Sequence, residues 1–295
     1  MKVGVSADAN STPSRQSGNK GMGLIRTIAI ANQKGGVGKT TTAVNLAASL
    51  AAQNRRVLLI DVDPQGNATM GAGVNKNGLE QSVYTVLLGE ASMLDARVEA
   101  QGGFDLIPAN RELAGAEIEL VSMPDRETKL KDAIHTLKAA ISAVAEEYDY
   151  ILIDCPPTLN LLTLNALCAA DSVLIPMQCE YYALEGLSDL VQTLRKMQQH
   201  LNPALEIEGL LRTMYDPRMT LSQQVAAQLE QHFGPKLFKA VIPRNVRLAE
   251  APSHGLPALL LDRSSKGAQA YLQLAAELIA RHEGEARAAG AQFNY

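Results

Sequence analysis

Tryptophan is absent from the 295-residue sequence, and aromatic residues make up only 4% of it. Hydrophobic residues still reach 46%, which is ordinary for a soluble globular protein. We therefore expect a core filled by leucine, isoleucine, valine and alanine. The sequence has only three cysteines and no C-x-x-C pair; they are Cys155, Cys168 and Cys179. This spacing argues against zinc and iron–sulfur sites, and a sparse, odd set is typical of a reduced cytosol.

The sequence also lacks a long apolar run and a strong charge imbalance. No stretch is long enough to span a bilayer, and the N-terminus has no apolar core of a signal peptide. Lysine and arginine number 27 against 31 aspartates and glutamates, which gives a net charge of −4. We expect a cytoplasmic protein in which any surface for nucleic acid is a local basic patch.

A glycine-rich segment at residues 33–42, QKGGVGKTTT, carries the strongest functional signal. An apolar β-type segment precedes it at residues 27–31 and a helix-favouring segment follows at 43–52, which is the context of a phosphate-binding loop. Lys39 is placed to contact terminal phosphates, and the Thr40 hydroxyl to bind Mg²⁺. Backbone N–H groups can face a phosphate where the loop has glycines, at Gly35, Gly36 and Gly38. The alternative interpretation is a surface turn that happens to carry lysines.

The start of this loop departs from the usual pattern. Gln33 stands where a glycine is usual, and a second lysine, Lys34, follows it. The loop still predicts binding of a nucleoside triphosphate, because Lys39 and the glycines before it are in place.

Two other apolar segments end in aspartate. Residues 56–63 end in Asp61 and Asp63, and residues 148–154 end in Asp154. Continuous apolar runs are typical of parallel strands buried on both faces, and ligands bind at the carboxyl ends of such strands. Asp154 is therefore a candidate Mg²⁺ ligand. Such aspartates can also simply cap turns, and the nearby phosphate loop favours the functional interpretation.

Strand-type and helix-type segments alternate along the rest of the chain. This pattern predicts an α/β fold with one doubly wound, mostly parallel sheet and helices on both faces. We expect a single ATPase domain at residues 24–282. Residues 1–23 should form a disordered tail, and residues 283–295, rich in alanine and glycine, a frayed one.

These motifs resemble the ParA/Soj partition ATPases, the short chromosomal type within the deviant Walker A class. The resemblance covers roughly residues 25–281. It is carried by five segments: KGGVGKTT at 34–41, DVDPQGN at 61–67, DCPP at 154–157, EYYALEG at 180–186 and IPRNVRLAEAPS at 242–253. The departures lie in the tails.

The resemblance implies roles for individual residues around ATP and Mg²⁺. Lys34 looks like the lysine that reaches across an ATP sandwich dimer to the partner's nucleotide, while Lys39 serves its own. Asp63 looks like the residue that positions the hydrolytic water, with Asp61 nearer the metal. The family also implies phosphate contacts from Val37 and Thr41, and adenine contacts from Thr213, Met214, Pro243 and Asn245.

The resemblance further implies partners. Arg218 and Arg247 are similar to arginines that bind double-stranded DNA without sequence preference, and Arg244 lies close by in the sequence. Pairing of these arginines with carboxylates such as Asp216 or Glu250 is the alternative. We expect an ATP-bound homodimer on the nucleoid, and slow hydrolysis that a ParB-type centromere-binding partner stimulates.

Two other functions are compatible with the predicted fold. A membrane-surface ATPase resembling MinD needs a basic amphipathic C-terminal helix, and residues 283–295 carry two glycines, two glutamates and little apolar mass. An iron–sulfur or electron-transfer protein, like the nitrogenase iron protein, is disfavoured by the cysteine spacing. The sequence therefore favours DNA segregation without membrane binding.

Overall fold

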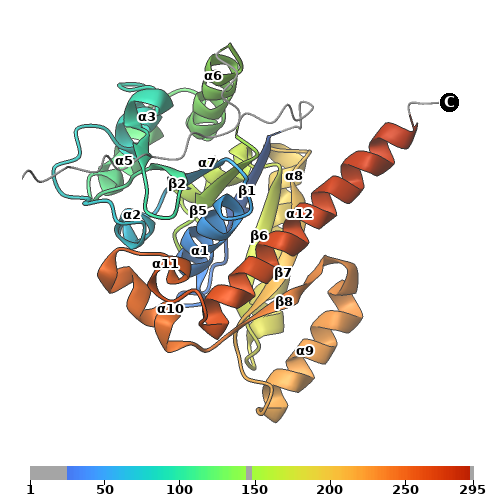
Figure 1. The fold of residues 1–295 in the computed structure, drawn as a ribbon. Coiled ribbons are helices and arrows are strands. Elements are labelled where there is room, and N and C mark those ends of the chain that lie inside the picture. Colours follow the sequence, from blue (N-terminus) through green and yellow to red (C-terminus); the bar gives the residue numbers. More distant parts are fainter. Residues whose placement is uncertain (1–24, 144–147, 293–295) are drawn as a thin grey trace, which may run out of the picture.

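The computed structural model describes residues 25–143 and 148–292, so the predicted disordered tail at residues 1–23 lies outside the described residues. Its centre is an eight-stranded sheet with the strand order β3-β4-β2-β5-β1-β6-β7-β8 (Figure 1). The strands are β1 (Arg26–Ile30), β2 (Val57–Asp61), β3 (Val98–Glu99), β4 (Asp105–Ile107), β5 (Tyr150–Asp154), β6 (Ser172–Gln178), β7 (Glu206–Tyr215) and β8 (Leu237–Pro243).

All strand pairs of this sheet are parallel except the edge pair of β3 and β4. The central strands β1, β2 and β5 are almost entirely buried, as expected of strands that are covered by helices on both faces. The predicted doubly wound, mostly parallel fold is confirmed.

Helices connect the strands and cover both faces of the sheet (Figure 1). They are α1 (Lys39–Ala51), α2 (Asn67–Gly71), α3 (Val83–Leu88), α4 (Met93–Ala96), α5 (Leu113–Val121), α6 (Lys129–Ala143), α7 (Leu161–Ala169), α8 (Ala183–His200), α9 (Thr220–Phe233), α10 (Val246–Glu250), α11 (Ala258–Leu261) and α12 (Lys266–Gln292). Short 3₁₀ turns lie at Gly234–Lys236 and Ala251–His254. The helices α2, α4, α7, α10 and α11 and the strand β3 were not predicted from the sequence.

The core has two halves, because successive side chains of a strand point to opposite faces of the sheet. Ile28 and Ile30 of β1 pack in one cluster with residues of α1 and α12, such as Leu46 and Leu274. Ala29 packs in the other cluster, with residues of α6, α7, α8 and α9. Aliphatic side chains fill both halves, as the scarcity of aromatic residues predicted.

The strand register brings the two aspartate-terminated strands together. Asp154 of β5 lies opposite Ile30 of β1 on one side and opposite Asp61 of β2 on the other. The phosphate loop follows β1 directly. Parallel pairing therefore places the glycine loop and both carboxylates at one edge of the sheet.

The C-terminal boundary of the domain differs from our expectation. Helix α12 continues to Gln292, whereas we expected a frayed tail from residue 283. Two ion pairs explain the extra turns: Glu283 lies 2.5 Å from Arg55, and Glu285 lies 3.0 Å from Arg26. The alanine-rich composition also favours helix and offsets the glycines.

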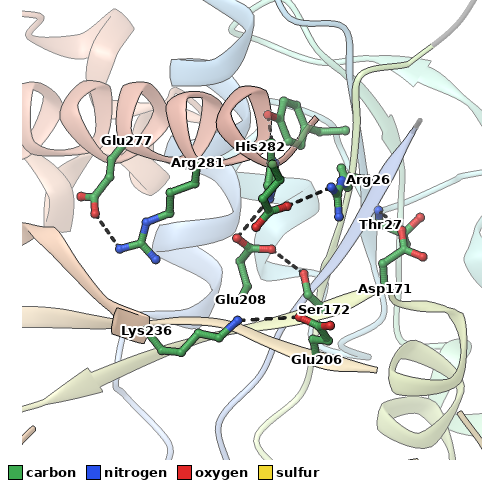
Figure 2. Close-up of polar contacts among 12 residues, drawn as sticks. Arg26, Thr27, Asp171, Ser172, Glu206, Glu208, Lys236, Glu277, Arg281 and His282 are labelled. Carbon is green, nitrogen blue, oxygen red and sulfur yellow. Dashed lines mark hydrogen bonds and ion pairs between the residues drawn. The ribbon is translucent and has the colours of Figure 1, made fainter. Parts of the chain in front are cut away.

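A buried polar cluster anchors the same part of α12 to the opposite edge of the sheet from the glycine loop. His282 lies 3.1 Å from Glu208 of β7 and 3.2 Å from the Tyr150 hydroxyl. Figure 2 shows that the second oxygen of Glu208 accepts a hydrogen bond from Ser172, at 2.6 Å. The end of α12 is therefore tied to three strands, β5, β6 and β7.

Candidate nucleotide-binding site

The glycine loop joins β1 to α1, as its sequence predicted. Gly36 and Gly38 have φ angles of 74° and 89°, in the left-handed region that favours glycine. Gly38 is the N-cap of α1, which begins at Lys39. The N-terminal N–H groups of this helix therefore face the loop, and such groups attract phosphate.

Side chains from distant segments hold the backbone of this loop in place. Asn32 donates a hydrogen bond to the carbonyl oxygen of Pro176 at 2.8 Å and accepts one from the Lys34 amide at 2.9 Å. The Thr213 hydroxyl donates to the carbonyl oxygen of Val37 at 2.8 Å. The strands β6 and β7 therefore preorganise the loop from its far side.

A cavity of about 560 Å³ opens beside the loop, a size typical of a small-molecule site. Eight predicted site residues and their neighbours line it: Gly35, Gly36, Gly38, Lys39, Thr40, Thr41, Asp63 and Met214, together with Pro64, Gln65, Asn67, Pro156, Pro157, Thr158 and Asn160. Val37 is buried behind the loop. Figure 1 shows α1 near the centre of the fold, with α2 to its left in this view.

Lys39 lies inside this cavity with its side chain mostly buried. Its ammonium donates to the carbonyl oxygen of Lys34, at 3.2 Å. Burial lowers the pKa of Lys39, whereas the charges of Asp154 and Asp63 act in the opposite direction. A buried cation with one neutral partner is poised to gain from a phosphate.

Asp154 is the most conspicuous carboxylate of the site. It is fully buried, and neither of its oxygens has a hydrogen-bond partner among the described residues. Burial and the neighbouring Asp61 raise the pKa of Asp154 well above its usual value, and Thr40 and Lys39 oppose this shift. A buried carboxylate with free oxygens beside a threonine hydroxyl fits Mg²⁺, which prefers oxygen ligands.

Asp61 is also fully buried, but its oxygens are occupied. Its Oδ1 accepts the Asp63 amide at 3.1 Å, and its Oδ2 accepts the amide and the hydroxyl of Thr69 at 2.8 and 2.7 Å. Burial raises the pKa of Asp61 to about 6, although the bonds from Thr69 lower it. Asp61 therefore shapes the loop after β2, and Asp154 is the better placed of the two for a metal.

Asp63 lines the cavity and is largely buried, at 8% exposure. Its Oδ1 accepts a hydrogen bond from the Gln65 amide at 2.9 Å, which orients the carboxylate. Its predicted role with the hydrolytic water remains a prediction.

The four residues predicted at the adenine divide into two groups. Met214 lines the cavity and has a φ of 49°, a strained value of the kind that is often found at functional sites. Thr213 is buried and bonded to the loop, as described above. Pro243 and Asn245 do not line the cavity, and the Asn245 side chain caps α10 by accepting from the Leu248 amide at 3.3 Å.

The two predicted lysines differ in their surroundings. The Lys34 side chain is 46% exposed, and its ammonium forms an ion pair with Glu180 at 2.5 Å. Lys39 points into the cavity of its own chain, and Lys34 extends at the surface beside it.

The predicted DNA-binding arginines lie at the ends of two adjacent strands. Arg218 follows β7, Arg244 follows β8, and Arg247 lies in α10. Arg218 pairs with Asp216 at 2.7 Å, and Arg247 pairs with Glu250 at 2.9 Å. The alternative weighed for these arginines, ion pairing within the chain, is thus present in the structure, and all three side chains remain at the surface.

Two cavity residues lie outside every segment singled out in the sequence: Thr158 and Asn160. Asn67 belongs to the segment at 61–67, where no role was predicted for it. Asn160 caps α7 by accepting from the Thr163 amide at 3.0 Å, and it also contacts Glu117 of α5. An asparagine before an apolar helical run is a recognisable N-cap signal, so Asn160 could have been found. Nothing in the sequence marks Thr158.

The strand, glycine loop and helix, with a buried lysine and an unpaired strand-end aspartate, define a P-loop nucleotide-binding protein with two lysines in its loop. An AAA domain family matches residues 25–207. The chain is 56% identical to the sporulation initiation inhibitor protein Soj of Bacillus subtilis, over 88% of this chain and 99% of Soj. It is 52% identical to the chromosome partitioning protein ParA of Caulobacter vibrioides, over 90% of this chain and 98% of ParA. The chain belongs to the ParA/Soj family of chromosome-partitioning ATPases.

A solved structure shares this fold. Cobyrinic acid a,c-diamide synthase from Mycobacterium smegmatis, crystallised with ADP and magnesium, has a TM-score of 0.73 and 40% identity. The match covers 87% of this chain and 94% of that chain. Its sequence is less similar to this chain than those of the partitioning proteins.

Proposed function

We propose that this protein is an ATP-dependent DNA-segregation ATPase whose ATP-bound dimer binds DNA. The observation that supports this most strongly is a buried Lys39 in the cavity, close enough to Asp154 for their charges to interact, while the Asp154 carboxylate forms no hydrogen bond among the described residues. A buried ammonium suits a phosphate group, and a buried carboxylate with free oxygens suits Mg²⁺. The identity to Soj and ParA supports partition as the process served.

Different residues of the site have different roles in ATP hydrolysis. The loop N–H groups and Lys39 hold the phosphates, which lowers the cost of charge that develops during phosphoryl transfer. Thr40 and Asp154 hold Mg²⁺, which neutralises phosphate charge when it is bound. Asp63, fixed by the Gln65 amide, orients a water molecule toward the γ-phosphate. The expected rate is slow until a ParB-type partner stimulates it.

Lys34, the exposed lysine of the loop, is the residue that would link the two subunits of the dimer. Lys34 extends at the surface and can reach a phosphate of a facing copy, much as an arginine finger does. ATP then joins the two subunits, and its hydrolysis releases them. This makes the nucleotide a switch between monomer and dimer.

The arginines at the ends of β7 and β8 are the proposed contact with DNA. Arg218 and Arg244 follow the adjacent strands β7 and β8, Arg247 lies in α10, and the Arg218 side chain is 88% exposed. Exposed ion pairs contribute little stability, so these arginines can exchange a carboxylate for a phosphate. Such contacts carry no sequence information and weaken steeply with salt. The protein would then sit on the nucleoid in the cytoplasm.

A salt series of binding to arbitrary duplex DNA tests the proposal. With ATP and an Asp63→Ala variant, we expect a dimer and DNA binding that falls as salt rises. The Arg218→Ala and Arg247→Ala variants should still dimerise, bind DNA more weakly and reduce the salt slope. A protein that neither dimerises nor binds DNA under these conditions contradicts the proposal.

A membrane-surface function was the alternative. No helix among residues 25–143 and 148–292 is long and apolar enough to cross a membrane. Liposome pelleting with ATP distinguishes a surface-bound protein from a DNA-bound one. Pelleting of the wild type with anionic vesicles, together with no retention on DNA, would favour the alternative.

A further inference from the structure

The exposed lysine of the loop is held by one carboxylate of its own chain. The Lys34 ammonium lies 2.5 Å from Glu180, and the two side chains are 46% and 47% exposed. The backbone of the loop has several independent supports, from Asn32, Gln178 and Thr213. This ion pair therefore orients the Lys34 side chain and is not needed to shape the loop.

The position of Glu180 is itself well determined. Glu180 follows β6 and precedes α8, in a tight turn. Its amide donates to the carbonyl oxygen of Gln178, and its own carbonyl oxygen accepts from the Ala183 amide, both at 3.0 Å. The Gln178 side chain donates to the carbonyl oxygen of Gly36 at 3.1 Å. The segment that carries Glu180 is thus bonded directly to the glycine loop.

We propose that Glu180 is a positioning residue that holds Lys34 against its own chain and opposes premature dimer assembly. This inference rests on the proposed function, in which Lys34 reaches the phosphates of a facing copy. The Glu180 carboxylate lies 2.5 Å from the Lys34 ammonium. When Lys34 reaches the phosphates of a facing copy, Glu180 must either lose this ion pair or remain close to the negatively charged phosphates. Both arrangements cost free energy, because like charges repel and a formed ion pair is lost.

The expected size follows from the exposure of the pair. Exposed ion pairs are individually weak, and a symmetric dimer has two of them. Removing the charge of Glu180 should therefore tighten the ATP-bound dimer by about 2- to 30-fold. The ADP-bound or nucleotide-free protein should remain monomeric, because no γ-phosphate is present to attract the released lysine.

The test is a set of dimer dissociation constants measured by sedimentation equilibrium with ATP and Mg²⁺, in an Asp63→Ala background. Glu180→Gln should tighten the dimer. Glu185→Gln removes an exposed carboxylate from the first turn of the adjacent helix α8, and as a matched control it should leave the dimer unchanged. In a Lys34→Ala background, in which we expect the ATP-dependent dimer to be lost, Glu180→Gln should not restore it. Thermal melts and ATP affinity establish that each variant is folded.

The outcomes separate this inference from the proposed function. If Asp63→Ala forms no ATP-dependent dimer, the proposed function fails, and the role of Glu180 fails with it. If the dimer forms but Glu180→Gln leaves it unchanged or weakens it, only the role of Glu180 is overturned. A dimer that Glu180→Gln restores without Lys34 also overturns it, since the carboxylate would then act through another group.

Discussion

Thr69 donates two hydrogen bonds to the same oxygen of Asp61, from its amide at 2.8 Å and from its hydroxyl at 2.7 Å. The hydroxyl also accepts a bond from the Ala109 amide at 2.9 Å. One small side chain thus joins the end of β2, the start of α2 and the loop after β4. It also stabilises the ionised form of a fully buried carboxylate.

We expect Thr69→Val to destabilise the protein by about 2–4 kcal/mol. The substitution keeps the shape but leaves the Ala109 amide and part of the Asp61 carboxylate unpaired, and each buried loss costs about 1–3 kcal/mol. Burial already raises the pKa of Asp61 to about 6, and loss of the hydroxyl should raise it further. A raised carboxyl pKa costs stability as pH rises through it, so the destabilisation should be larger at pH 8 than at pH 5.

Urea unfolding at these two pH values measures the effect of Thr69→Val. Thr69→Ser keeps the hydroxyl and serves as the control, with a loss well below that of valine. Equal stability of the valine variant and the wild type would show that the hydroxyl is not needed.

Asp154→Asn should stabilise the nucleotide-free protein while abolishing hydrolysis. The native carboxylate is fully buried, and neither oxygen is paired among the residues that the structure describes. A neutral amide of the same shape avoids the cost of burying a charge. A gain of 1 kcal/mol raises the melting temperature by about 2–4 °C for a domain of roughly this size. Thermal melts without nucleotide, beside a phosphate-release assay with ATP and Mg²⁺, measure both effects.

The pH dependence of this gain is a further check. The folded pKa of Asp154 lies well above its usual value, so the wild-type penalty is present at high pH and disappears as the pH falls below that pKa. The advantage of Asp154→Asn should therefore shrink in acid. A variant that melts below the wild type at pH 8 would contradict the assignment of Asp154 as an unsatisfied charge.

Substitution of the two lysines of the loop should affect two different properties, ATP binding and dimer formation. Lys39 lies in the cavity, so Lys39→Ala should lower ATP affinity by at least about tenfold, as expected for a charge-assisted contact of 1.5–3 kcal/mol. Lys34 is exposed, so Lys34→Ala should keep ATP affinity within a few-fold yet lose the ATP-dependent dimer. Equilibrium binding of a fluorescent ATP analogue and sedimentation report the two properties. Identical defects in both variants would argue against a division of roles.

Glu208→Gln should loosen the end of α12. Burial would raise the pKa of Glu208, but the hydrogen bond and charge of His282, with the bond from Ser172, outweigh it and lower the pKa. A lowered carboxyl pKa stabilises the fold above the unfolded value of 4.5, and this contribution is lost as pH falls through the folded pKa. We expect a loss of about 1.5–3 kcal/mol at pH 7, shrinking toward pH 3.5.

Hydrogen exchange of the α12 amides at pH 7 localises the effect of Glu208→Gln. Exchange should rise near His282 and remain unchanged in α1. Lys236 pairs with the exposed Glu206 at 3.7 Å (Figure 2), so Glu206→Gln removes a neighbouring carboxylate with little expected loss. A loss of stability that does not vary with pH would contradict the assigned charge.

Much of the fold followed from local patterns. The glycines at positions 36 and 38 do adopt positive φ. The end of α12 was predicted incorrectly, because Arg26 and Arg55 hold it from positions more than 200 residues away in the sequence. Pro243 and Asn245 were assigned to the adenine by resemblance, and they lie outside the lining of the cavity.

The sequence by itself determined which chemical groups form the site. These are a loop of glycines after a strand, with positive φ angles that favour glycine, a lysine at the start of the next helix, and carboxylates at the ends of two other strands. It did not distinguish Asp61 from Asp154, since each ends an apolar run. The tertiary structure decided this, because Thr69 satisfies Asp61, whereas the oxygens of Asp154, on the strand between β1 and β2, form no hydrogen bond among the described residues and lie beside Thr40. It also placed Glu180 beside Lys34, 146 residues away. Hydrogen bonds and ion pairs depend on distance in space, and only the folded chain brings these groups within reach.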